Sequence, residues 1–214
     1  MPRFPIRSLI FLNVVFLNLA CSQYRYMQKI KTDESCVLLF KPDFVRATYK
    51  ISVDVVGKHI SGLLVMKQMP DSSTRIVFTN EMGFSFFDFG FLPHDRFMVY
   101  QIVPQMNKKA LVKTLRKDFD LILFRSMDSS KYYALADSNL VYHAFPQSSG
   151  INFYITDTHC SQLIKMQRSS NKKPVMEAQL YDGSGGNTPD SISIRHLNFN
   201  FSISLKKIPA LAPQ

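Results

Sequence analysis

Residues 82–91 read MGFSFFDFGF, a segment with five phenylalanines and a single charged side chain. Phe84 and Phe86 fall on one parity of an extended chain, whereas Phe87 and Phe89 fall on the other. Because alternate side chains of a strand point to opposite faces, a bulge is needed to keep them all on one face. The segment therefore predicts a strand that bends, and bent strands are typical of sheets that curve towards a barrel.

The segments around this strand follow the same two-residue period. Tyr49, Ile51 and Val53 alternate with polar side chains, and Gly57-Lys58 is a tight-turn sequence before a second alternating segment. Short polar turns separate the later segments in the same way, which indicates strands linked as hairpins. We expect about eleven strands, over 49–55, 59–68, 75–79, 84–91, 97–103, 132–136, 140–145, 151–156, 161–167, 175–181 and 191–206.

The last of these segments, 191–206, changes phase as the opening one does. Ile192 and Ile194 share one parity, whereas Phe199 and Phe201 share the other. We interpret the segment as one long strand with a bulge where the parity changes, and a strand of this length suits a strongly coiled sheet.

Helical periodicity is clear only in 107–122, where Leu111, Leu115 and Phe119 recur on one face. Asn107 is the expected N-cap. The order of elements predicts a mainly β protein: a single curved antiparallel sheet forming an unclosed, half-open barrel of about eleven strands, with this helix covering the open side.

The concave side of such a sheet is either packed or hollow, and both alternatives are open at this point. A small barrel is filled by its own side chains, whereas a wider one encloses a ligand cavity, and an apolar lining suits acyl chains. If the side is hollow, we expect its lining to include Phe84, Phe86, Phe87, Phe89, Phe91, Leu111, Leu115, Phe119, Phe199 and Phe201.

The first twenty residues have the layout of a secretory signal peptide. Arg3 and Arg7 precede the uncharged apolar run 9–20, and Ala20-Cys21 follows as in a bacterial lipobox. We expect Cys21 to carry lipid; a secreted protein without lipid and a retained N-terminal anchor are the alternatives. The expected divisions are a signal peptide over 1–20, a lipidated tether over 21–35, a β domain over 36–208 and a tail over 209–214.

Charge and cysteine content narrow the classes of partner. The formal net charge is +10, but the basic residues are dispersed and no nucleic-acid motif accompanies them, so we expect a solvated basic surface and no nucleic-acid binding. With Cys21 lipidated, Cys36 and Cys160 remain. They either form one disulfide or are two small buried residues.

Catalytic and metal-binding motifs are missing from the sequence. It has no HExxH, GxSxG, P-loop or CxxC pattern, and its five histidines show no metal-ligand spacing. His159 and Cys160 are adjacent, but strand neighbours point to opposite faces. We interpret His196, at the phase change, as a hydrogen-bonded structural residue. No catalytic residue, metal or cofactor is therefore expected.

The arrangement resembles the lipoprotein-localisation factors, the LolA/LolB-like superfamily. The resemblance rests on Cys21 and on the succession 61–67 (SGLLVMK) and 75–83 (RIVFTNEMG), and it covers most of 44–206. It implies a concave face that holds lipoprotein acyl chains, an anchor in the outer membrane facing the periplasm, and a soluble periplasmic carrier as partner. Membrane-anchored members carry a protruding apolar loop tip, for which Met69-Pro70 is the nearest candidate. The alternative function is a structural or protein-interaction lipoprotein with a filled core and no ligand.

Overall fold

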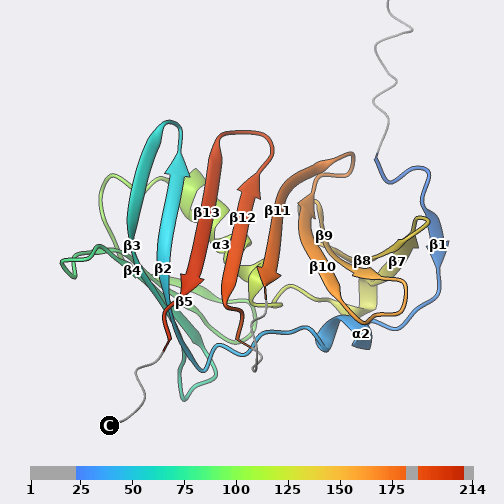
Figure 1. Cartoon of the computed structure of the whole chain (residues 1–214), viewed down its shortest axis with the longest axis horizontal. Helices are drawn as coiled ribbons and strands as arrows, with labels where there is room; N and C mark the ends of the chain where they lie inside the picture. Colours follow the sequence, from blue (N-terminus) through green and yellow to red (C-terminus); the bar gives the residue numbers. More distant parts are fainter. Residues whose placement is uncertain (1–22, 182–187, 210–214) are drawn as a thin grey trace, which may run out of the picture.

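The structure, a computed structural model, describes residues 23–181 and 188–209. Its strands form one antiparallel sheet of 13 strands that is not closed on itself (Figure 1). The strands are β1 (Gln28–Ile30), β2 (Arg46–Val55), β3 (Lys58–Gln68), β4 (Thr74–Thr79), β5 (Ser85–Phe91), β6 (Phe97–Ile102), β7 (Tyr133–Ala136), β8 (Leu140–Pro146), β9 (Ile151–Asp157), β10 (Leu163–Ser169), β11 (Pro174–Tyr181), β12 (Ser191–His196) and β13 (Phe201–Lys207). The helices are α2 (Ser35–Leu38), α3 (Lys109–Ile122) and the 3-10 turn η2 (Ser129–Lys131).

Two meanders, β2 to β6 and β7 to β13, make up the sheet. They join where β13 pairs with β2, so that β6 lies at one edge and β1, paired with β7, at the other. The chain passes from β6 to β7 through α3, which lies behind β13, β12 and β11 in Figure 1. The predicted class, a curved antiparallel sheet left open and crossed by one principal helix, is confirmed.

The bulge predicted in the opening segment is present. Phe78 of β4 is opposite Phe87, but the next residue, Thr79, is opposite Ser85, so Phe86 is the extra residue in β5. The extra residue reverses the parity of the strand, and Phe87 then stacks on its same-face neighbour Phe89 at 4.3 Å between ring centroids.

The prediction of one long strand over 191–206 is wrong. The chain reverses at 197–200, and β12 and β13 form a hairpin in which Ile194 is opposite Ile203. The change of parity comes from this reversal and not from a bulge. The turn contains two asparagines but neither glycine nor proline, so the usual sequence signals of a hairpin are missing.

The segment expected to be a tether belongs to the fold from residue 23 onward. Tyr24 is 9% exposed and stacks on Phe153 at 4.6 Å, within a small second core beneath β8 and β9. β1 then adds an edge strand beside β7. The sequence predicts a tether here because most residues of the segment are polar. The ring of a tyrosine nevertheless supplies apolar surface that can be buried in a core. The segment expected to be a signal peptide and the expected lipidation site Cys21 lie outside the described residues.

A disulfide joins Cys36 of α2 to Cys160 in the turn between β9 and β10, with 6.0 Å between the Cα atoms. It links positions 124 residues apart in the chain. Of the two alternatives that the sequence left open, the structure has the disulfide.

His143 is buried in β8 next to this disulfide, and its contacts suit the neutral ring. The Tyr132 hydroxyl lies 2.8 Å from Nδ1 and donates to it, and Nε2 lies 3.2 Å from the Thr156 hydroxyl, which itself donates to a backbone carbonyl. Burial lowers the pKa of His143 from 6.5 to about 4.

We therefore expect His143 to make the protein acid-sensitive. Above pH 6.5 the ring is neutral in both states, whereas below it the unfolded chain binds a proton that the folded protein excludes down to about pH 4. The contribution of His143 to stability is thus complete above pH 6.5, and about 2 kcal/mol of it is lost at pH 5. Urea unfolding at pH 7 and pH 5 measures this loss. Between pH 7 and pH 5, the free energy of unfolding of a His143→Gln variant should fall by about 2 kcal/mol less than that of the parent. An equal fall in both proteins would contradict the assignment of this acid sensitivity to His143.

Candidate ligand-binding cavity

The helix α3 presents its apolar face to the sheet, as its sequence predicts. Leu115 is 3% exposed and Phe119 is fully buried, where it meets Phe87 and Phe91 edge to face. The predicted N-cap is wrong: the capping position is Lys108, which has extended backbone angles and makes no capping side-chain hydrogen bond.

A buried ion-pair network also fastens α3 to the sheet, at strands β10 and β12. Both carboxylate oxygens of Asp118 are used: Arg168 of β10 donates to Oδ1 at 2.7 Å, and His196 of β12 lies 2.8 Å from Oδ2. The side chain of Asp118 is 0% exposed. The sequence pattern gives no hint of this network, because an aspartate between Lys117 and Phe119 resembles the solvated face of an amphipathic helix.

Between α3 and the sheet lies an apolar cavity of about 230 Å³. Its walls come from α3, from the segment just before it and from β2, β3, β4, β5 and β13. Lys58 and Gln105 are the only polar residues among those lining it. A water molecule occupies about 30 Å³ in the liquid, and a methylene group is of similar size, so the cavity has room for about seven or eight methylene groups.

Half of the ten predicted wall residues border this cavity, two others are packed core, and a third packs against that core. Phe89 and Phe91 are fully buried among aromatic side chains, and Phe86 lies against Phe78 at 4.6 Å between ring centroids. The concave side is thus largely filled and only locally hollow. The predicted residues at the cavity are Phe87, Leu111, Leu115, Phe119 and Phe201.

For Phe84 and Phe199 the expected place in the wall is wrong. Their exposed fractions are 59% and 47%, and neither borders the cavity. Phe84 lies in the turn before β5, and Phe199 lies in the turn between β12 and β13. Parity places a side chain only inside a regular strand, so it does not apply to these two residues.

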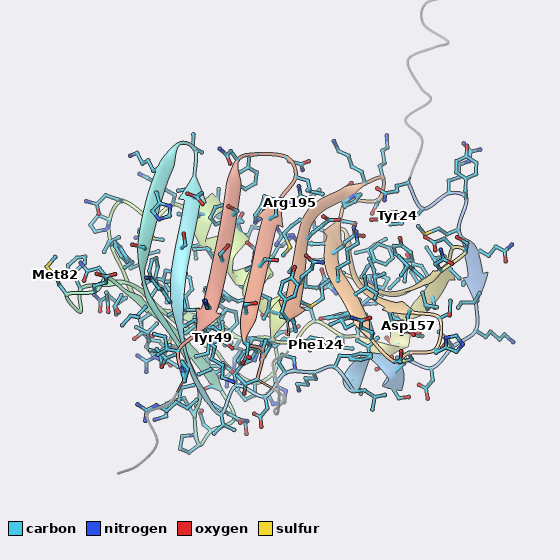
Figure 2. The ribbon with its side chains drawn as sticks, viewed as in Figure 1. Tyr24, Tyr49, Met82, Phe124, Asp157 and Arg195 are labelled. Atoms are coloured by element: carbon cyan, nitrogen blue, oxygen red, sulfur yellow. A yellow bond between two sulfur atoms is a disulfide. The ribbon has the colours of Figure 1, made fainter. Side chains whose placement is uncertain are left out.

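The β4–β5 turn ends in an apolar tip that the sequence analysis missed. Met82 is 90% exposed and projects away from the sheet (Figure 2). The side-chain oxygen of Asn80 accepts from the backbone N–H groups of Met82 and Phe84, and Gly83 has a φ of +83°. Met69, the candidate named from the sequence, is half-buried. The Asn80 to Gly83 turn signal could have identified the tip.

One group of side chains, Ser52, Asp54 and His59, resembles a catalytic triad in composition only. His59 Nδ1 lies 2.7 Å from Asp54, and its Nε2 lies 3.5 Å from the Ser52 hydroxyl. Ser52 lies inside the sheet, between Ser61 and Ser204 of the neighbouring strands. The backbone N–H groups around Ser52 are used in hydrogen bonds to the two neighbouring strands. No pair of them is available as an oxyanion hole, and we therefore assign no catalytic role to this group. Within 23–181 and 188–209, no group of three or more His, Cys, Asp or Glu side chains is placed to hold a metal.

Comparison with known proteins gives likeness of structure only. No family model matches the chain, and no curated protein matches its sequence. A LolA superfamily protein from Nitrosomonas europaea aligns with a TM-score of 0.48 and 8% identity, over 86% of this chain and 96% of that one. A protein described as an outer-membrane lipoprotein-sorting domain from Vibrio parahaemolyticus has a TM-score of 0.44 and 8% identity, over 81% of this chain and 88% of that one.

A third structure, a DUF1329 family protein from Desulfovibrio piger, aligns with a TM-score of 0.40 and 8% identity, over 81% of this chain and 88% of that one. The likeness to all three concerns the fold alone. At these values the likeness is distant, and the evidence for function comes from the cavity. None of the helices in the described part of the chain has the length and apolarity to span a bilayer.

Proposed function

We propose that this protein binds the end of a single acyl chain, or a similarly slender apolar group, in the cavity beneath α3. The observation that carries the proposal is the chemistry of the walls: a partly enclosed space lined by aliphatic and aromatic side chains, with Lys58 and Gln105 its only polar lining residues. Transfer of an alkyl chain from water into such a space is favourable by about 0.8 kcal/mol for each methylene group buried.

The size of the cavity restricts the ligand class. About 230 Å³ suits part of one chain, so a lipoprotein with several acyl chains would have to displace α3 from the sheet. The helix is fastened at Asp118 in its second half, and it contacts the cavity through Leu111 and Leu115 in its first half. A movement that opens the cavity therefore separates apolar contacts first and leaves the ion-pair network as the hinge.

The place of the protein in the cell is part of the same proposal. The Arg-flanked apolar run before Cys21 supports a lipid anchor at Cys21. A place in the outer membrane facing the periplasm, with a soluble carrier as the source of lipid or lipoprotein, is what the resemblance to the lipoprotein-localisation factors implies. The exposed Met82 and Phe84 supply an apolar tip of the kind that would contact a bilayer during delivery. The intact mass of protein extracted from membranes tests the anchor, because a diacylglycerol adds a defined mass to a chain that begins at Cys21.

Filling the cavity tests the binding function. Leu111→Trp places a larger ring into the space, and we expect affinity for a fluorescent single-chain fatty-acyl probe to fall at least about tenfold, because the chain and the indole compete for one volume. Leu39→Trp makes the same change at a residue that is 76% exposed and should leave affinity unchanged. Probe titration by fluorescence measures both.

The alternative function, a structural lipoprotein without ligand, predicts a different result. The parent protein would then bind no probe, and native mass spectrometry would find no lipid retained on the purified chain. Either observation counts against a carrier. A damaged fold could also abolish probe binding, so the packing of the core is tested separately. Phe89 is fully buried, and Phe89→Ala should cost about 3–5 kcal/mol of stability in a correctly folded protein, because it leaves a void in packed core.

A further inference from the structure

A second concavity, a groove of about 940 Å³, lies beside the outer side of α3. It is bounded by Lys113, Thr114 and Lys117 of the helix and by the β8–β9, β10–β11 and β12–β13 turns. It has no lining residue in common with the apolar cavity. The two spaces are separated by α3 and by ring contacts of His196, which lines the groove, with Phe201, which lines the cavity, at 4.9 Å between centroids.

The charged side chains that line this groove are all cationic or capable of being so. Lys113, Lys117, Lys172 and Arg168 line it together with His196, and no Asp or Glu is among the lining residues. Asp118, the ion-pair partner of Arg168, is buried behind it and has both oxygens occupied. Counted against Asp118, the cations Lys113, Lys117, Lys172 and Arg168 leave a local net charge of +3. Among the described residues, no salt bridge involves any of the three lysines.

Repulsion within the groove is visible at Lys117, which is half-buried. Burial, followed by the nearby charges of Arg168 and Lys113, lowers the pKa of its ammonium group. The groove is also firmly built at the β8–β9 turn: Gly150 has a φ of +88°, and a β-carbon there would collide with the carbonyl oxygen of Ser169. Cations that outnumber the one buried carboxylate Asp118, gathered in a preformed concavity, form a site that an anion would stabilise.

We propose that this groove binds a ligand that carries one or more phosphate groups. Lysine and arginine are the usual cationic partners of phosphate, and the hydroxyls of Ser148 and Ser149 in the lining add neutral donors. A net charge of +3 calls for more than one negative charge, which a single carboxylate does not supply. A phospholipid headgroup and a soluble phosphorylated compound share this chemistry.

The test compares two charge-matched double variants of the full chain. Lys113→Gln/Lys117→Gln removes two cations from the groove, whereas Lys50→Gln/Lys206→Gln removes two from an exposed strand pair that does not line it. Calorimetric titration with pyrophosphate measures free phosphate binding. Co-sedimentation with vesicles of phosphatidylglycerol, against phosphatidylcholine alone, measures headgroup binding.

We expect the groove variant to bind at least about tenfold more weakly than the parent in one or both assays, and the control variant to bind like the parent. Vesicle binding with this dependence identifies a lipid headgroup; pyrophosphate binding without vesicle binding identifies a soluble ligand. Equal weakening in both variants would reduce the effect to overall charge and overturn the proposal, as would no binding of either probe by the parent. The acyl-probe titration at the cavity is independent of these results, because the two sites have separate linings.

Discussion

Replacing Asp118 with alanine is expected to lower the free energy of unfolding by about 3–5 kcal/mol. The side chain is 0% exposed, and the side chain of Arg168, its partner, is 12% exposed. Without the carboxylate, a guanidinium largely withdrawn from water has no counter-charge, and this uncompensated charge dominates the loss. His196 loses its partner in the same step.

Urea unfolding measured through the tyrosine signal would give the loss directly. The matched control is Asp128→Ala, which removes an exposed carboxylate that pairs with Lys131 at 3.0 Å and caps η2 by accepting from the Ser130 backbone N–H, and it should cost only about 1 kcal/mol. If Asp118→Ala were as stable as Asp128→Ala, the network would not be what holds α3 to β10 and β12.

Removing the disulfide should have an effect of similar size. The double variant Cys36→Ser/Cys160→Ser opens a loop of 124 residues, and the entropy returned to the unfolded chain corresponds to about 4–5 kcal/mol of stability. Thermal unfolding under oxidising conditions measures the loss.

Reduction of the parent protein provides the control for this substitution. A thiol reductant should lower the melting temperature of the parent to that of the double variant and leave the variant unchanged. Detection of free thiols in the denatured protein shows that the reductant has broken the disulfide. If the melting temperature of the parent were then unchanged, the result would contradict a stabilising role for the bond.

The sequence predicts most of the sheet because most strands bury only one face. The alternation in 49–55 identifies β2 within a few residues, and the parity change in 84–91 identifies the bulge at Phe86. The same parity argument fails over 191–206, because a bulge and a hairpin reversal produce the same change of phase. Distinguishing them needs the pairing partner, which is a property of the folded sheet.

The candidate site divides in the same way. Leu111, Leu115 and Phe119 were predictable, since helical spacing places them on one face whatever the surroundings. The depth of packing was not predictable. Nothing in residues 82–91 indicates that Phe89 is packed core whereas Phe87 borders the cavity. Asp118 was out of reach for a different reason, because its partner Arg168 lies 50 residues away and is brought to it only by the fold.

The pairing of β13 with β2 places the last strand of the described chain at the middle of the sheet. During synthesis or export, β2 to β6 emerge well before β13, so β2 waits as an unprotected edge with its apolar side uncovered. Long-range pairing of this kind is slow and leaves nascent chains open to aggregation. A polypeptide with this strand order therefore carries an unpaired edge in the middle of its future sheet until its final residues have been synthesised.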